Sequence, residues 1–334
     1  MKGFVKKIKG LFPVTVANAV YVDGTTQTLA DAMEDGELGN IGKSPVIKDI
    51  IHMDYKVVPV NRRGSHDCTV MGSDIVSFDK YDDGGGIYYT DIETMTTSIV
   101  RQHNFVESNS AKLEMKSVDY KNGKLLVGNG RSGSTADFGR AYIFYEADSW
   151  KDMTDTIDFT NCGEYKEIDL TALGIKTYAF WGDGPNNDMV YVSCNLFNDI
   201  YRIQLGRGSQ QWDNGTFTAD TPTNKFNGSW QIINHWHQEG ARGANAAHGG
   251  QFYNGHLYLA DNHGRLAWVH KCILRDNGKL EFQPIYLDAL AIDGTDLYGN
   301  LDGLCIHDGT MYVQPLKHHS SVSGSVFLTI KVPV

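Results

Sequence analysis

The chain has 334 residues, with 30 Lys and Arg against 40 Asp and Glu, so its formal net charge is −10. This acidic balance disfavours a nucleic-acid-binding protein, which needs a field of basic side chains to displace counterions. Hydrophobic residues make up 41% of the chain and no run of about 18 apolar residues occurs, which favours a globular protein without a membrane-spanning helix. The 36 glycines, 17 tyrosines and 14 phenylalanines, against eight prolines, indicate many strands joined by tight turns.

The cysteines are odd in number and widely spaced, and no two of them form a CxxC pair. They are Cys68, Cys162, Cys194, Cys272 and Cys305. This spacing disfavours a disulfide framework or a zinc knuckle, so we expect buried free thiols. We expect no cofactor and no metal ion.

Residues 11–40 differ in pattern from the rest of the chain. Partly alternating apolar residues come first, at Val14, Val16, Val20 and Val22. Leu29, Ala32 and Met33 then lie at the i, i+3 and i+4 positions of one face of a short helix. A helix of this length is not stable alone, so we expect this segment to pack on a partner surface.

This segment also contains a recognisable motif. Residues 12–25 read FPVTVANAVYVDGT and residues 28–32 read TLADA. This stretch resembles the N-terminal segments of tailed-bacteriophage fibre and appendage proteins, where an AVYxxDGT…TLxDAL-like run precedes the distal domain and serves virion attachment or trimerisation. The resemblance implies a virion structural protein on the surface of the phage particle. Residues 1–44 would then attach it to other virion proteins and form a homotrimer through the seven apolar residues named above.

From residue 45 onward, one pattern recurs five times at unequal intervals. A glycine or asparagine turn precedes two or three apolar or tyrosine residues, and these runs begin at Ile75, Leu125, Met189, Leu257 and Met311. A strand-like run lies before each turn, and another β-branched and aromatic run follows each copy. Outer strands are visible at residues 165–170 and 280–287, where polar and apolar residues alternate. Each copy therefore predicts a four-stranded antiparallel sheet.

Repeated four-stranded sheets predict an all-β fold, a five-bladed β-propeller over residues 45–334. The last copy ends near Val334 after its third strand, so residues 55–60 are expected to supply the fourth strand and close the ring. A β-sandwich is the alternative. Its strands would be spaced at about 8–12 residues without a longer period, so the propeller is favoured.

Polar residues occur at comparable depth on the predicted innermost strands. They are His66, Asp67, Glu114, Lys116, Asp183, His248 and Asp302. One interpretation is a glycoside hydrolase in which Asp67, Glu114 and Asp302 supply carboxyls about 5 to 9 Å apart, with Glu114 as the acid. The favoured interpretation is a polar, water-filled channel, because no contiguous motif fixes a catalytic spacing.

Histidines in residues 233–240 raise the question of a metal site. His235 and His237 have the spacing that places two imidazoles on one face of a strand. A third ligand would have to come from His248, His256 or Glu239. We favour a loop with polar histidines, since His-x-His alone is a weak signal.

Tryptophans near turns and in Asn- and Gly-rich segments suit the stacking of a sugar ring. The predicted ligand-binding residues are Trp181, Trp212, Trp230 and Trp236, together with His66 and His248. Packing between blades is an equally good explanation for any single tryptophan.

The sequence therefore predicts a virion appendage whose propeller binds a glycan on the host surface, with three subunits strengthening a weak contact. Two alternatives stay open: a glycan-cleaving enzyme with the same fold, and a structural virion decoration without receptor binding.

Overall fold

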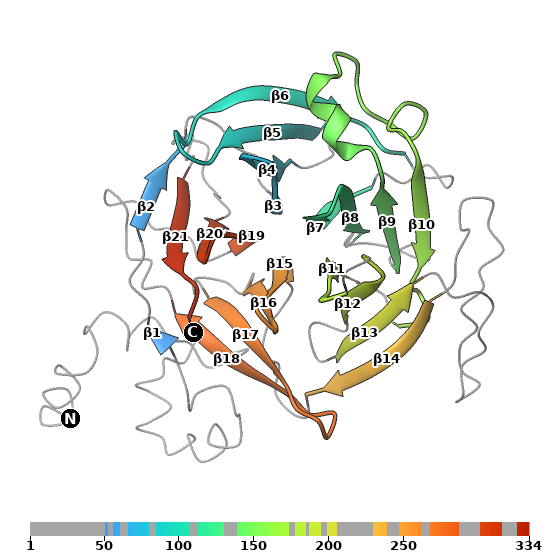
Figure 1. Ribbon diagram of the computed structural model, residues 1–334, viewed down its shortest axis with the longest axis vertical. Helices are drawn as coiled ribbons and strands as arrows, with labels where there is room; N and C mark the ends of the chain where they lie inside the picture. The colour runs from blue at the N-terminus through green and yellow to red at the C-terminus, as the bar shows by residue number, and fades with distance from the viewer. Residues whose placement is uncertain are drawn as a thin grey trace, which may run out of the picture.

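The structure is a computed structural model that describes most of the chain after residue 50. The described residues are 51–52, 56–60, 66–79, 85–106, 113–129, 139–173, 178–184, 187–194, 199–205, 230–238, 247–261, 268–286, 301–315 and 326–333. Their strands form five sheets arranged in a ring (Figure 1). The prediction of an all-β, five-bladed propeller is confirmed.

Each blade contains four antiparallel strands ordered outward from the centre of the ring (Figure 1). Blade 1 consists of β3 (Cys68–Met71), β4 (Asp74–Phe78), β5 (Gly85–Asp91) and β6 (Thr97–His103). Blade 2 consists of β7 (Met115–Lys121), β8 (Lys124–Asn129), β9 (Arg140–Phe144) and β10 (Tyr165–Asp169), with a 3-10 helix, η3 (Ala147–Asp152), between β9 and β10.

The other three blades repeat this order. Blade 3 consists of β11 (Tyr178–Trp181), β12 (Met189–Cys194), β13 (Asp199–Leu205) and β14 (Trp230–His237). Blade 4 consists of β15 (Ala247–Tyr253), β16 (His256–Asp261), β17 (Trp268–Leu274) and β18 (Leu280–Tyr286). Blade 5 consists of β19 (Leu301–His307), β20 (Thr310–Pro315), β21 (Val326–Lys331) and β2 (Lys56–Pro59).

The ring closes as the sequence predicts. β2 pairs antiparallel with β21, with Val57 opposite Leu328, so residues from before the first blade complete the last one (Figure 1). An additional strand, β1 (Ile51–His52), pairs in parallel with β18 and adds a fifth strand to blade 4. The sequence pattern does not reveal β1, because two residues are too few to show a period.

The turns between the first and second strands explain why the repeat is visible in the sequence. Asn122, Asn254 and Asp308 have positive φ angles of 50°, 47° and 46°, and the glycine after each is also positive. Two successive positive φ angles define the type I′ turn, which matches the twist of antiparallel strands and favours Asn-Gly and Asp-Gly. Turn chemistry therefore fixes the register of three of these hairpins.

Apolar clusters fill the spaces between blades. Four of the clusters contain between ten and 17 buried residues each among those described. The cluster between the first and last blades, which we call the seam cluster, contains six: Val60, Cys68, Ile75, Cys305, Tyr312 and Phe327. The seam of the ring thus has the smallest apolar contact in the described part of the protein.

Two further expectations concern the cysteines and the membrane. All five cysteines are free and buried, as predicted. Within the described ranges, no helix is both long and apolar enough to span a bilayer.

Candidate functional site

Asp67 lies at the centre of the ring, directly before β3, and is fully buried. Its Oδ1 accepts hydrogen bonds from the backbone N–H groups of Cys68, at 2.8 Å, and Leu304, at 3.2 Å. Its Oδ2 accepts one from the N–H of Val118, at 2.7 Å. A single carboxyl therefore joins the innermost strands of blades 1, 2 and 5.

Side-chain oxygens also accept backbone N–H groups between blades 1 and 2 and between blades 2 and 3. Thr69 Oγ1 accepts from the N–H of Tyr120, at 2.8 Å. Asp119 Oδ2 accepts from the N–H of Trp181, at 2.7 Å. The innermost strand of a blade has no neighbour toward the centre, so its free N–H groups need side-chain acceptors from the adjacent blade. Polar residues on the inner strands are therefore part of the ring's architecture.

The centre of the ring is closed at the level of Asp67. A Cβ atom on Gly249 of β15 would collide with Oδ1 of Asp67 and come within 2.8 Å of the Cα of Gly303. A Cβ atom on Gly303 would come within 2.8 Å of the carbonyl oxygen of His66. The inner strands of blades 1, 4 and 5 therefore pack closely at this level, and the polar, water-filled channel stays a prediction for the rest of the axis.

Burial also changes the protonation of these carboxyls. Loss of water raises the pKa of Asp67 well above its usual value, although three backbone hydrogen bonds oppose the shift. Burial raises the pKa of Asp119 to about 8. A carboxyl that keeps its proton could act as an acid, but Asp67 has no exposed surface on which a substrate could meet it.

The other predicted catalytic carboxyls are Glu114 and Asp302. Glu114 is only 4% exposed, and its Oε2 lies 3.0 Å from Nζ of Lys116. Asp302 belongs to β19, and its side chain lies outside the described part of the structure. Asp183 follows the end of β11, at the opposite end of the inner strands from His66, and pairs with Arg202 at 2.9 Å. Its expected place in the polar ring is therefore corrected.

Two histidines, His66 and His248, are predicted to bind a ligand near the centre of the ring. His66 is buried, and its backbone carbonyl accepts a hydrogen bond from Nε2 of Gln314 at 2.7 Å. His248 belongs to β15, and its side chain lies outside the described set. His66 therefore offers little exposed surface to a ligand, and the role of His248 stays a prediction.

The tryptophans are interior residues rather than exposed sugar platforms. Trp181 and Trp230 are each 2% exposed, and Trp236 is 8% exposed. Their indole N–H groups donate to backbone carbonyls of Lys124, Asp169 and Arg275, respectively. The expectation that these three faces bind a sugar is therefore wrong, and packing between blades is their role. Trp212 lies outside the described residues.

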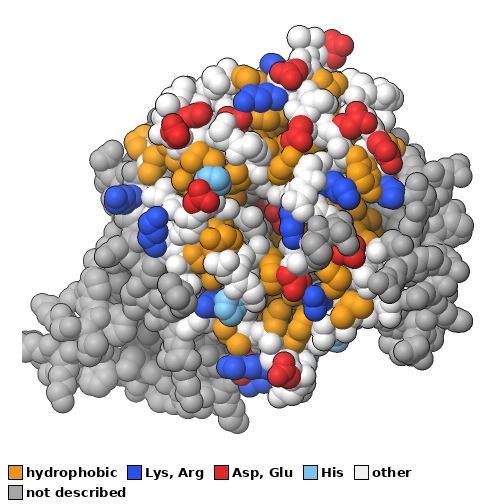
Figure 2. Space-filling model, viewed as in Figure 1, with side chains coloured by type: hydrophobic (Ala, Val, Ile, Leu, Met, Phe, Trp, Pro, Cys, Tyr) orange, Lys and Arg blue, Asp and Glu red, His pale blue; other side chains and the backbone are white. Residues whose placement is uncertain are grey.

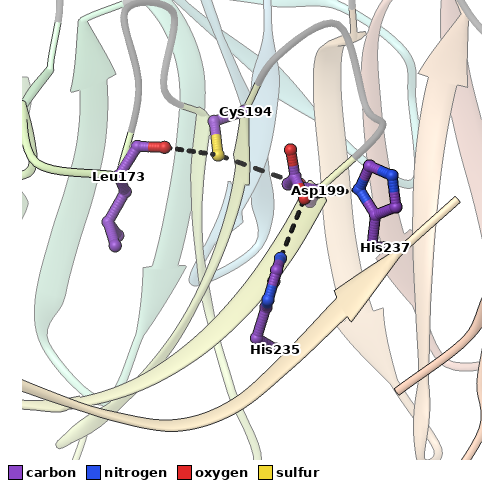
Figure 3. A network of polar contacts seen from close by, with 5 residues as sticks. All are labelled: Leu173, Cys194, Asp199, His235 and His237. Carbon is purple, nitrogen blue, oxygen red and sulfur yellow. Dashed lines mark hydrogen bonds and ion pairs between the residues drawn. The ribbon is translucent and has the colours of Figure 1, made fainter. Parts of the chain in front are cut away.

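A polar cluster lies on the outer strands of blade 3, where two imidazoles meet the carboxylate of Asp199 (Figure 3). Oδ1 of Asp199, at the start of β13, lies 2.8 Å from Nε2 of His235 and 2.8 Å from Nδ1 of His237. The imidazoles are 43% and 49% exposed, whereas the carboxylate is 11% exposed. The ring of Tyr201 stacks on His235 with centroids 4.2 Å apart. We call Asp199, Tyr201, His235 and His237 the rim cluster.

Strand pairing explains why these four side chains meet. Asp199 is opposite His237 in the β13–β14 ladder, and Tyr201 is opposite His235. Residues two apart on a strand share one face, so both pairs lie on the same side of the sheet. The His-x-His spacing therefore does place both imidazoles on one face of a strand, and the loop interpretation of this segment is corrected.

The hydrogen bonds fix how the rim cluster presents its outer atoms. An ionised carboxylate only accepts hydrogen bonds, so His235 carries a proton on Nε2 and His237 carries one on Nδ1. In the neutral imidazoles, Nδ1 of His235 and Nε2 of His237 are therefore acceptors. The exposed edge of the cluster can receive hydroxyl donors at two positions.

The sequence could not identify Asp199 as the partner, because 24 residues separate β13 from β14 and no short turn therefore sets the register of the two strands. Of the three candidates for a third metal ligand, His256 takes no part in this network, and the side chains of His248 and Glu239 lie outside the described structure. Among the described residues, no three His, Cys, Asp or Glu side chains are grouped so as to hold a metal ion.

One face of the ring carries charged side chains of both signs (Figure 2). Acidic and basic side chains are interspersed over the face seen in Figure 2, with hydrophobic side chains between them. Val106 and Ile233 are the large hydrophobic residues that are exposed in the described part. This surface favours contacts of mixed polarity over a large apolar interface.

The predicted oligomerisation residues Val14, Val16, Val20, Val22, Leu29, Ala32 and Met33 lie outside the described structure, as does the whole of residues 1–44. The division of the chain at residue 44 therefore stays a prediction.

Comparison with models of protein families and with the sequences of curated proteins gives no match. Among solved structures, the chain is similar to a glutaminyl cyclase from Myxococcus xanthus, with 9% identity and a TM-score of 0.47 over 86% of this chain and 100% of that one. An auxiliary nutrient binding protein from Bacteroides thetaiotaomicron has 11% identity and a TM-score of 0.37, over 84% and 74% of the two chains.

The WD40 domain of coronin from Toxoplasma gondii is similar at 9% identity, with a TM-score of 0.37 over 86% of this chain and 90% of that one. Such low identities and TM-scores carry no activity, substrate or partner over to this chain. No comparison indicates a phage origin or a glycan ligand. The propeller fold is shown by the arrangement of the five sheets themselves.

Proposed function

We propose that this protein is a binding module whose propeller recognises a hydroxyl-rich glycan on a host surface, and that residues 1–44 attach it to a phage particle as a homotrimer. The observation that carries the binding role is the rim cluster. It combines exposed imidazoles, a carboxylate that orients them and an aromatic ring within one small area.

The chemistry of the rim cluster suits sugar hydroxyls. The outer nitrogens of His235 and His237 are acceptors at a fixed separation, because one carboxylate oxygen holds both rings in place. Sugars offer adjacent hydroxyl donors, and binding sites for small polar ligands use a few polar groups that are held in position by the fold. Pre-organised side chains lose little rotamer entropy on binding, which favours affinity at a shallow site.

The inner-strand carboxyls favour a binding role over glycan cleavage, because they are already engaged in contacts within the ring. Asp67 accepts hydrogen bonds from three backbone N–H groups, and Glu114 forms an ion pair with Lys116. A glycosidase needs two carboxyls that both reach the scissile bond. The virion location and the trimer have separate support, namely the resemblance of residues 12–32 to phage appendage segments.

The test is a glycan array probed with the full chain, followed by calorimetry on each positive glycan. His235→Ala and His237→Ala should each weaken binding by at least about tenfold, since each removes one polar contact from a small site. His307→Ala is the matched control, because His307 is also half-exposed and lies 3.4 Å from an acidic residue, Asp308, in a different blade.

Circular dichroism would confirm that the variants fold. Binding that survives both rim substitutions would place the glycan site elsewhere, and the absence of any positive glycan would reject the receptor role. Release of reducing sugar from a positive glycan would favour the enzyme instead. Antibodies against the chain should label purified particles if residues 1–44 attach it to a virion.

A further inference from the structure

Two thiols meet at the seam where the ring closes. The Sγ atoms of Cys68, in β3 of blade 1, and Cys305, in β19 of blade 5, lie 3.6 Å apart. Both residues are buried, at 0% and 1% exposure, and 237 residues separate them along the chain. No other pair of the five cysteines is in sulfur–sulfur contact in the described structure.

The backbone around this pair permits a covalent bond. A Cβ atom on Gly303 would lie 3.1 Å from the backbone nitrogen of Cys68, so the two inner strands approach closely at this point. Leu304 also donates its N–H to Asp67, which joins the two strands one residue before each thiol. A disulfide has a sulfur–sulfur bond of about 2.05 Å, so the two atoms need to approach by only about 1.5 Å.

A bond between these two cysteines would stabilise the closed ring, because it would join the first blade to the last. The seam cluster has the fewest buried apolar residues of the five clusters, and β2, which closes the ring, contains only four residues. A covalent link between the first and last blades would prevent the ring from opening at this weak contact. Long loops closed by a disulfide restrict the unfolded chain most in the chain-entropy description.

We propose that Cys68 and Cys305 form a disulfide clasp at the ring seam under oxidising conditions. The oxidant is a small-molecule disulfide such as oxidised glutathione. One protein thiolate attacks it, forms a mixed disulfide and releases one glutathione thiol. The second protein thiolate then attacks the mixed disulfide, which gives the Cys68–Cys305 bond and a second glutathione thiol. Because both sulfurs are buried in the closed ring, exchange takes place during folding or when the seam opens.

The experiment refolds the full chain from denaturant, once with a reductant and once in a glutathione redox buffer. Each sample is denatured, alkylated, digested and mapped by mass spectrometry. The oxidised sample should show one cross-linked peptide pair that contains Cys68 and Cys305, with Cys162, Cys194 and Cys272 alkylated. Its melting temperature should exceed that of the reduced sample by about 5 to 10 °C.

Three variants test whether the cross-link and the rise in melting temperature depend on this pair of cysteines. Cys68→Ser and Cys305→Ser should each abolish the cross-link and the effect of oxidant on the melting temperature. Cys162→Ser, a buried cysteine away from the seam, should retain both. The clasp is rejected if all five cysteines remain alkylated after oxidative refolding, or if the cross-link forms without a rise in melting temperature. Neither outcome bears on glycan binding.

Discussion

The backbone N–H of Leu304 in the last blade donates a hydrogen bond of 3.2 Å to Oδ1 of Asp67 in the first. The same carboxyl accepts from Val118 in the second blade, so three blades share one acceptor group. Because this group is fully buried, water cannot replace it when it is removed.

Asp67→Ala should therefore destabilise the whole ring. It leaves three buried N–H groups without an acceptor, and each such group costs about 1–3 kcal/mol, so the free energy of unfolding should fall by at least about 3 kcal/mol. Thr69→Val is the matched comparison, since it removes the acceptor of a single N–H, that of Tyr120, and should cost less. Urea unfolding of both variants measures the difference. Equal losses in the two would show that Asp67 does not act as a shared acceptor.

Asp119 should make the protein less stable as the pH rises toward 8. Burial raises its pKa to about 8 from the ordinary value of 3.8, so between these values the folded state holds a proton that the unfolded state has lost. Stability must then fall with rising pH, by roughly 1.5 kcal/mol between pH 6.5 and 8. Asp119→Asn keeps an acceptor oxygen for Trp181 but cannot titrate, so its melting temperature should change less over this range.

His103 contributes little change over this range, because most of its linkage lies at lower pH, and its small contribution is the same in wild type and Asp119→Asn. Melting curves for wild type and Asp119→Asn at pH 6.5, 7.25 and 8 are the measurement. Parallel profiles for the two proteins would mean that Asp119 is already ionised in the folded state.

His103 should make the protein less stable as the pH falls below 6.5. Burial lowers its pKa from 6.5 to about 4, so between these values the unfolded state binds a proton that the folded state does not. Stability from this residue is fully present above pH 6.5 and is lost as the pH falls to 4, with a total of about 3 kcal/mol. His103→Gln retains a donor but does not titrate, so it should lose less stability between pH 6.5 and 4.5.

The buried carboxyls of Asp67 and Asp119 oppose this trend, so the quantity to compare is the difference between wild type and His103→Gln at each pH. A difference that stays constant from pH 6.5 to 4.5 would contradict a neutral, buried His103.

The features that could be predicted from the sequence are those fixed by local chemistry. Asn122-Gly123 and Asp308-Gly309 adopt the turns that their residue types favour, and the strands on either side follow from them. The closing strand could be predicted because the last copy lacked a fourth strand. These inferences need only neighbouring residues and the count of repeats.

The candidate site could not be predicted, because it depends on contacts between distant residues. His235 and His237 lie on β14, whose exposed face is polar enough to look like a loop, and their partner Asp199 is in another strand. Burial of Trp181 and Trp236 is likewise decided by the neighbouring blade. An indole beside a turn has the same local sequence whether it packs inward or faces solvent.

Removal of residues 1–60 should weaken the ring by deleting its closing strand. β21 would lose its antiparallel partner β2 and become an open edge, and Val60 would be lost from the seam cluster. We expect a lower melting temperature and self-association under reducing conditions, where no covalent clasp can compensate. Removal of residues 1–50 is the control, because the resulting chain keeps both β1 and β2 and lacks the same N-terminal residues. Sedimentation velocity and thermal melts on the two truncated chains provide the comparison. If the shorter chain were as stable and as monomeric as the longer one, four blades and a three-stranded fifth would suffice, and the pairing of β2 with β21 would not be what holds the ring shut.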